Sequence, residues 1–295
     1  MTILSPQTRL FALVAGGLGL LFAWPLYEHI RLALDIDLHS HTLLVPFVSI
    51  YFAWLKKDEL PEPTAPNKTL GILLAVIGIG LASIRCLGTG PESIEDRVVL
   101  SSLAFVSLCL AAAAFIFGAN ILRSQSFSLG FLIFFTPMPL FLQDWVNAFF
   151  QYTSAEVSYH MVRLADIPIF RGHPLTFQLP TIDLHVAPSC SGIRSSLVLL
   201  ITSIVAGKLF LQSPWSRWAL IVFIVPLAIV RNGFRIFTIS YLCVHVGPHM
   251  HNHWIHHKGG PIFFILSLPP FFAFLYWLWK RERRPGRERA EAEGQ

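Results

Sequence analysis

Long apolar stretches alternate with short polar ones along the chain, and eight of the apolar stretches are long enough, or nearly so, to cross a membrane. A transmembrane helix needs about 20 mostly apolar residues to span roughly 30 Å of hydrocarbon. The predicted spans cover residues 10–30, 42–55, 70–87, 98–118, 127–150, 190–211, 218–244 and 261–279. This pattern predicts an all-α polytopic membrane protein with about eight transmembrane helices.

Prolines interrupt two of these spans. The stretch 42–55 is short and contains Pro46, and 127–150 contains Pro137 and Pro139, so a kink or break is predicted in the latter. The first stretch has no clear cleavage site after it, and we expect it to remain as a helix rather than to be removed as a signal peptide.

One long polar connection separates the fifth and sixth spans. Its first part, residues 154–164, has the mixed composition of an interfacial helix. Its second part, residues 167–186, places apolar residues among prolines and polar residues, which predicts a short hairpin over the membrane face. This extracytoplasmic segment leads directly into the sixth span.

Basic residues predict the orientation of the chain. Lys and Arg are most frequent in the loops after the second, fourth, sixth and eighth spans, and these loops are therefore expected in the cytoplasm together with both termini. Residues 1–279 are interpreted as one transmembrane domain and 280–295 as a basic cytoplasmic tail. That tail supplies much of the net charge of +5 and is interpreted as a positive-inside anchor, so no nucleic-acid partner is expected.

The overall composition agrees with a membrane protein. The chain is 54% hydrophobic and only 13% charged, which excludes an ordinary soluble domain of 295 residues. Its four cysteines include no CxxC pair, so no disulfide framework or thiolate metal site is indicated. Cys86, Cys109 and Cys243 lie in or near apolar spans and are interpreted as small core residues.

Cys190 differs from the other cysteines because it stands at the start of the sixth span, in the string Pro188-Ser189-Cys190-Ser191-Gly192. The first turn of a helix has unpaired N–H groups and the positive end of the helix dipole, which favour an anion. A thiol there is more readily ionised, and the thiolate is the nucleophile. The position therefore predicts a catalytic cysteine.

The predicted topology brings basic residues to the same side of the membrane. Arg235 lies about 14 Å inside the outer end of the seventh span, at 1.5 Å per residue. A charged arginine at that depth usually faces a cavity or a partner. Arg231 lies four residues earlier on the same helix face; a structural ion pair with a buried acid is the alternative for the pair. Arg194 lies one turn from Cys190 and could hold the thiolate or reach toward the interface.

A histidine-rich loop precedes the eighth span on the same outer side, from His249 to His257. Its spacing is compatible with a transition-metal site or with a polar interfacial loop. Acyl transfer by a cysteine needs a group that accepts and returns a proton, and histidine suits this at neutral pH. His256 and His257 are the candidates, and no cofactor or metal is expected.

These motifs resemble the exosortase/archaeosortase family of membrane transpeptidases. The resemblance rests on CSG at a helix start, on NGFR from Asn232 to Arg235, and on HHKGG leading into PIFF, and it is strongest over residues 182–264. In the family an arginine follows an asparagine at the spacing seen here, which favours Arg235 over Arg231. Ser191 and Asn232 are accordingly expected to support the site.

The resemblance implies a function and a location. It implies that Cys190 cleaves C-terminal tripartite sorting signals, such as those with a Pro-Glu-Pro motif (PEP-CTERM), through a thioester. Arg235 would stabilise the oxyanion, and a lipid- or exopolysaccharide-linked acceptor would receive the product. The active site would lie on the extracytoplasmic face of the cell inner membrane.

Two other classes of function are open on the sequence alone. The first is a transporter or metal-handling protein that uses His251, His253 and the membrane arginines. The second is a non-catalytic membrane subunit of a polysaccharide export system. Neither requires a cysteine, an arginine and a histidine on one face of the membrane.

Overall fold

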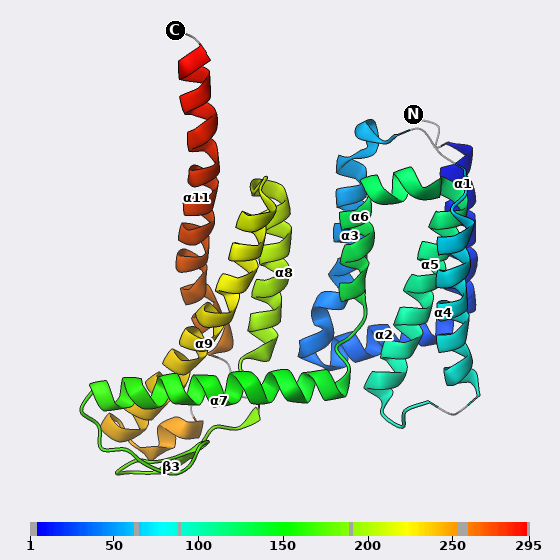
Figure 1. Ribbon diagram of the computed structural model, residues 1–295. Helices are drawn as coiled ribbons and strands as arrows, with labels where there is room; N and C mark the ends of the chain where they lie inside the picture. The colour runs from blue at the N-terminus through cyan, green and yellow to red at the C-terminus, as the bar shows by residue number, and fades with distance from the viewer. Residues whose placement is uncertain (1–4, 62–64, 88–89, 189–190, 253–258, 294–295) are drawn as a thin grey trace. The chain divides into compact units, whose positions relative to one another are not determined.

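The computed structural model is almost entirely helical and describes residues 5–61, 65–87, 90–188, 191–252 and 259–293 (Figure 1). Within these residues six helices are long and apolar enough to cross a membrane, and there are up to eight spans if each of two bent helix pairs counts as one. The chain is thus a polytopic helical membrane protein. It divides into two compact units, residues 1–143 and 144–295.

The first unit is built from helices that follow one another with short connections. Its described elements are α1 (Pro6–Leu21), α2 (Ala23–Asp35), η1 (Asp37–Leu44), α3 (Val45–Leu55), η2 (Lys57–Glu59), α4 (Lys68–Cys86), α5 (Ile94–Ser124), α6 (Ser126–Phe131), η3 (Leu132–Phe135) and the first residues of α7 (Leu140–Leu164).

The first predicted span is broken near its middle. α1 and α2 meet at Phe22 with a bend of 76°. Pro25 explains the break, because in a continuous helix its nitrogen would donate to the carbonyl of Leu21, and proline has no N–H and a ring that clashes there. The sequence analysis did not anticipate this bend.

The fifth predicted span is also broken, at the place where prolines occur. The α6–η3 segment and α7 are bent by 88°, with Pro137 and Pro139 between them. The backbone N–H of Leu140, at the start of α7, donates to Asp96 Oδ1 at 3.0 Å. The predicted break in residues 127–150 is therefore present.

Glycines allow α4 and α5 to lie close together. A Cβ added at Gly71 would lie 2.7 Å from Phe115, and one added at Gly78 would lie 2.7 Å from Leu108. Small residues at such positions are typical of helix packing in membranes, where van der Waals contact is a main attractive force.

A buried polar group lies beside these helices in the first unit. His29 is 1% exposed, its Nδ1 lies 2.8 Å from Ser102 Oγ, and its Nε2 lies 2.8 Å from Thr42 Oγ1. The Thr42 hydroxyl donates to the carbonyl of His39, so it accepts from His29 Nε2, and Nδ1 accepts from Ser102. The His29 ring also stacks on Phe135, with centroids 4.4 Å apart.

The second unit combines a crosswise helix, a small sheet and three long helices. It contains most of α7, the strands β1 (Phe170–His173), β2 (Thr176–Gln178) and β3 (Asp183–His185), and the helical elements α8 (Ile193–Phe210), α9 (Pro214–His245), η5 (Pro248–Asn252) and α11 (Gly260–Glu293). Figure 1 shows α7 running across the end of the unit where α8 and α11 begin, with the sheet at the same end.

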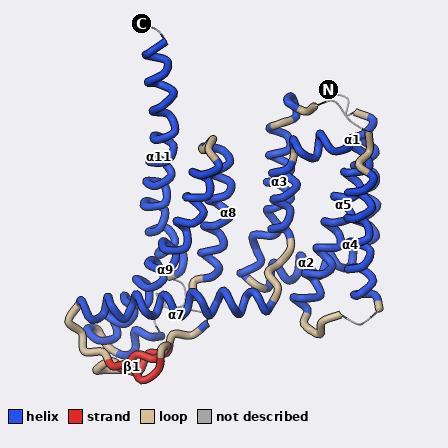
Figure 2. Tube along the Cα trace, in the orientation of Figure 1, coloured by secondary structure: helices blue, strands red, loops and turns tan. Residues whose placement is uncertain are grey.

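The segment in which a hairpin was expected forms three short antiparallel strands, in the order β1-β2-β3 (Figure 2). Thr176 and Phe177 pair with His185 and Leu184 across β2 and β3. The position of this sheet over the outer membrane face stays a prediction.

Two apolar cores hold the second unit together. One joins α7, the sheet and the C-terminal half of α9, and includes Val162, Phe177 and Ile239. The other joins α8, α9 and α11, and includes Leu199 and Phe271. The first core fixes α7 and the sheet against the part of α9 that carries the predicted arginines.

Candidate active site

The described residues include five of the eight predicted site residues. Cys190, His256 and His257 lie outside the residues that the structure describes, as does His253 of the alternative metal site. Ser191, Arg194, Arg231, Asn232 and Arg235 are described, and all of them belong to the second unit.

The turn that follows Cys190 requires a glycine. Gly192 is the N-cap of α8 and has φ +72°, a backbone conformation that favours glycine. A Cβ at this position would also lie 2.9 Å from Asn232 Oδ1 and 3.2 Å from Arg231 Nη2. The absence of a side chain at Gly192 therefore lets two polar residues of α9 approach the turn.

Arg231 binds this turn from α9. Its Nη2 donates to the carbonyl oxygen of Gly192 at 3.2 Å and to Ser196 Oγ at 3.1 Å. The Ser196 hydroxyl in turn donates to the same carbonyl at 2.9 Å. Arg231 is 7% exposed and Asn232 is 2% exposed, so Arg231 binds the turn from a buried position and Asn232 lies buried beside it.

Two residues of α7 bind the chain before and after Cys190. Ser191 Oγ donates to Asn147 Oδ1 at 2.7 Å and accepts from the backbone N–H of Ile193 at 3.4 Å. The amide of Gln151 donates to the carbonyl oxygen of Val186. Asn147 and Gln151 are four residues apart, which places them on one face of α7.

Arg235 lies one turn beyond Arg231 on α9 and is half-buried. Between the two arginines, α9 passes close to α7 at Gly233, where an added Cβ would lie 2.8 Å from Val157 Cγ1. This close contact fixes the arginine-bearing turn of α9 against the helix that also holds Ser191.

A cavity of about 240 Å³ lies beside the first turns of α8. It is lined by Arg194, Ser195 and Val198 of α8 and by Gly260, Pro261 and Phe264 at the start of α11. Arg194 is exposed, and it brings a positive charge to a mostly apolar space. The cavity joins the helix that follows Cys190 to the helix that follows His256 and His257.

The comparison with protein families identifies the family of this chain. The model of the transmembrane exosortase family matches residues 33–275, which is most of the chain. The chain belongs to this family. No curated protein and no solved structure matches it.

The exosortase match covers both units and every residue of the candidate site. It includes the turn at Gly192, the arginines of α9, and the polar residues of α7 that the sequence analysis did not select. Asn147 and Gln151 were missed because a polar pair four residues apart in a helix is common. Only the tertiary structure reveals that they reach the segment around Cys190.

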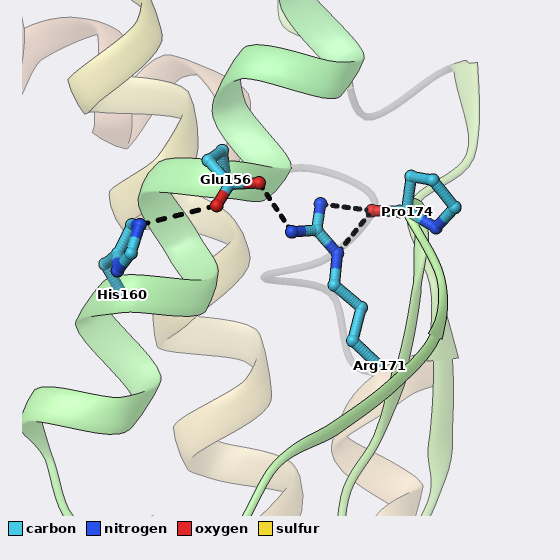
Figure 3. A network of polar contacts seen from close by, with 4 residues as sticks. All are labelled: Glu156, His160, Arg171 and Pro174. Carbon is cyan, nitrogen blue, oxygen red and sulfur yellow. Dashed lines mark hydrogen bonds and ion pairs between the residues drawn. The ribbon is translucent and has the colours of Figure 1, made fainter.

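A polar network in the exosortase region fastens the sheet to α7 (Figure 3). Glu156 of α7 forms an ion pair with Arg171 of β1 and lies 3.3 Å from His160 Nε2. Arg171 also donates to the carbonyl oxygen of Pro174, at 3.1 Å from Nε and 2.7 Å from Nη2. Its guanidinium lies 5.4 Å from the ring centroid of Tyr159. The sheet is thus held on the helix that supports the turn.

Proposed function

We propose that this exosortase is a membrane-embedded cysteine peptidase and transpeptidase with Cys190 as its nucleophile. Family membership supports a membrane protease or transpeptidase that processes exported proteins carrying sorting signals. The observation that carries the finer proposal is the support around the turn: buried Arg231 and Asn232 contact Gly192, and Asn147 binds Ser191. A nucleophile must be held in place to react, and this support holds the residues next to Cys190.

The reaction is an acyl transfer in two steps. His256 or His257 accepts the thiol proton, and the Cys190 thiolate attacks the carbonyl carbon of the scissile peptide bond. The C–N bond breaks, the imidazolium gives its proton to the leaving amine, and a thioester remains. An acceptor amine then attacks the thioester, passes its proton to the imidazole and releases the thiolate.

The two arginines of α9 take different parts in this proposal. Arg231 is buried and donates to Gly192 and Ser196, so it supports the turn. Arg235 is half-buried one turn away and is assigned to the developing oxyanion, where a fixed positive charge stabilises the transition state. Arg194, at the cavity beside α8, is assigned to substrate binding.

Charge supports an extracytoplasmic site. α8 begins, α9 ends and α11 begins at one end of the second unit (Figure 1). The opposite end carries the basic residues Lys208, Arg217, Lys280, Arg281 and Arg283. By the positive-inside rule the basic end is cytoplasmic. We therefore assign the site to the outer face of the inner membrane, with both termini in the cytoplasm.

The proposed substrate is a C-terminal sorting signal of the tripartite, PEP-CTERM-like kind. Its membrane span would place the preceding peptide at the level of the cavity lined by Arg194 and Phe264. The proposed acceptor is an amine linked to a membrane lipid or an exopolysaccharide, because such a molecule retains the product at the cell surface.

Replacing the nucleophile tests the proposal. Cys190→Ala and Cys190→Ser are produced beside Cys109→Ser and Cys243→Ser, which change the described free cysteines of α5 and α9. We expect a co-expressed reporter with a sorting signal to accumulate uncleaved only with the Cys190 variants, and a thioester or mixed disulfide to be trapped only at Cys190. Normal processing by Cys190→Ala would refute the proposal.

The same preparations separate the two alternatives. A metal-handling protein would bind metal when purified, would lose it in the His251→Ala/His253→Ala double variant, and would not need Cys190. A non-catalytic export subunit would show no selective reaction of Cys190 with a cysteine-directed probe. Either result, combined with normal processing by Cys190→Ala, would replace the peptidase assignment.

A further inference from the structure

Two adjoining cavities lie in the first unit, away from the candidate active site. One has a volume of about 420 Å³ and the other about 270 Å³. They share the lining residues Phe11 of α1, Ala53 of α3, and Ser128 and Leu129 of α6, and α5 lines both. Because they share these side chains, they form one elongated space lined by α1, α3, α5, α6 and η3.

This space is almost entirely apolar and is lined by aromatic rings at one end. On α5 its lining runs from Phe105 to Phe117, a rise of about 18 Å, and continues past the non-helical kink at Gly118 to Leu122. Phe105 and Phe135 line the end away from Gln125, with ring centroids 6.3 Å apart. The straight part of the space is thus comparable in length with the hydrocarbon of one leaflet, about half of the roughly 30 Å in a bilayer.

The other end of the space is polar. Gln7 of α1 and Gln125, between α5 and α6, line it there. Lys56, one turn after Ala53, lies beside Gln125, because its Nζ donates to the carbonyl oxygen of Ser124 at 3.3 Å. An ammonium group has three N–H donors, so this bond leaves two for another acceptor.

Basic residues outnumber acidic ones around this end. Arg9 follows the lining residue Thr8, and Arg123 follows the lining residue Leu122. Among the described residues the acidic ones of this region are Asp58 and Glu59, both exposed on η2, and in the sequence Glu62 follows the lining residue Pro61. Lys57 lies over the Trp54 ring at 4.8 Å from its centroid.

We propose that this space holds one acyl chain of an anionic phospholipid, with the phosphate of its headgroup bound by Lys56. An apolar channel with a cationic group at one end matches a hydrocarbon chain that carries a negative head. The apolar walls of this half-open space would gain van der Waals contacts along a hydrocarbon chain seated in it. By the positive-inside rule the lipid belongs to the cytoplasmic leaflet, because loops with basic residues surround the headgroup end.

The proposal does not depend on the chemistry of Cys190. The channel lies wholly in residues 1–143, whereas the candidate site lies in residues 144–295. A failure of the lipid test would therefore leave the peptidase proposal unchanged, and the reverse also holds.

Native mass spectrometry of the full chain tests the binding of the acyl chain. Detergent-purified protein is supplied with phosphatidylglycerol or with phosphatidylcholine of the same chain length, and bound lipid is counted. Ala53→Phe fills the junction of the two cavities and is expected to abolish retention of both lipids. Ala12→Phe is the matched control, because Ala12 is exposed on α1. Equal retention by the two variants would overturn the proposal.

Replacing Lys56 tests whether it binds the headgroup phosphate. We expect the unmodified protein to retain phosphatidylglycerol about tenfold over phosphatidylcholine, the ratio that one charge-assisted hydrogen bond supplies. Lys56→Gln is expected to reduce this preference severalfold, while Lys57→Gln, with the same change in net charge, leaves it unaltered. No preference in the unmodified protein, or the same loss in both variants, would contradict the assignment to Lys56.

Photo-crosslinking of the unmodified protein keeps the proposal testable even if Ala53→Phe does not fold. Phosphatidylglycerol with a diazirine on its acyl chain is expected to label peptides that contain Phe11, Ala53 and Phe117. Exposed apolar residues of α4, such as Ile72 and Val76, report ordinary contact with bulk lipid. Labelling of α4 equal to that of the channel peptides would overturn the proposal.

Discussion

Arg231 shows how one buried charge can organise a turn. Placing a charged arginine inside a membrane costs free energy unless its N–H groups find hydrogen-bond acceptors. Arg231 meets the Gly192 carbonyl and the Ser196 hydroxyl, while its Nη1 has no hydrogen-bond partner among the described residues. Its guanidinium therefore binds two neutral acceptors, and the described part of the chain shows no carboxylate within ion-pair distance of it. For Arg231, the ion-pair alternative from the sequence thus finds no support in the described residues.

A side chain at Gly192 should disrupt this arrangement. In Gly192→Ala the new Cβ would meet Asn232 Oδ1 at 2.9 Å, in a residue with φ +72°. We expect a loss of stability of about 1–3 kcal/mol and a loss of processing, measured by thermal unfolding in detergent and by reporter cleavage. Gly80→Ala is the control, because an added Cβ there has nothing within 4 Å. Equal stability of the two variants would contradict the described turn.

The buried histidines of the first unit allow a paired prediction. His29 has a partner at each ring nitrogen, whereas His39, at 0% exposed, has none among the described residues. His29→Phe leaves two buried hydroxyl groups with one partner fewer, which should cost about 1–3 kcal/mol. His39→Phe removes two unsatisfied polar atoms and should be neutral or stabilising. Thermal unfolding compares the two, and a larger loss for His39→Phe would show that His39 has a partner.

At the level of single residues, the sequence predicts only part of the candidate site. The CSG motif and the arginine spacing drew attention to the turn before α8 and to α9, because helix starts and intramembrane charges have distinctive local signatures. Asn147 and Gln151 have no such signature. Their importance comes from the path of α7 across the end of the second unit (Figure 1), and sequence spacing does not state which segments a helix will pass.

At the scale of elements, hydropathy located α4, α8 and α9 to within a few residues. Two helices differ more: α7 covers Leu140–Leu164 where the span was predicted at 127–150, and α11 continues beyond the predicted end at residue 279. α4, α5, α8 and α9 all overlap predicted spans, because a run of apolar residues in lipid must form a helix to satisfy its backbone. Other differences lie at prolines. Pro25 breaks the first stretch into α1 and α2, and the three short strands before α8 were expected as a simpler hairpin.

The link between α7 and the turn before α8 is testable as a coupling of two elements. Ser191 donates to Asn147 Oδ1, so Asn147→Asp retains an acceptor and Asn147→Leu does not. We expect Asn147→Leu and Ser191→Ala each to slow reporter cleavage. In the double variant the total loss of transition-state stabilisation should be no larger than that of one hydrogen bond, ~1 kcal/mol, because both changes remove the same bond.

Asn147→Asp serves as the conservative control for this cycle and should process the reporter faster than Asn147→Leu. Reporter cleavage is measured at saturating and at limiting substrate, because a residue that positions the nucleophile affects turnover more than substrate binding. Additive losses in the double variant would mean that the two side chains act independently.

At the scale of the whole molecule, orientation decides where the chemistry takes place. The second unit has a basic end, with Lys208, Arg217 and the residues that follow Trp279, and an end with α7 and the sheet. Glu282 of α11 accepts from the backbone N–H groups of Gln212 and Ser213, so α11 is fastened to the loop between α8 and α9 at the basic end. This end is therefore a fixed part of the unit and a suitable reference for topology.

Cysteine labelling in intact cells tests this orientation. In a background without native cysteines, Phe170→Cys places a thiol on the sheet and Trp215→Cys places one at the start of α9. Both positions are well exposed, at 71% and 83%. We expect a membrane-impermeant maleimide to label Phe170→Cys in intact cells and Trp215→Cys only after permeabilisation, since basic loops stay in the cytoplasm. The opposite pattern would place the proposed nucleophile on the cytoplasmic side. Exported substrates present their sorting signals on the other side of the membrane, so this result would contradict the peptidase proposal.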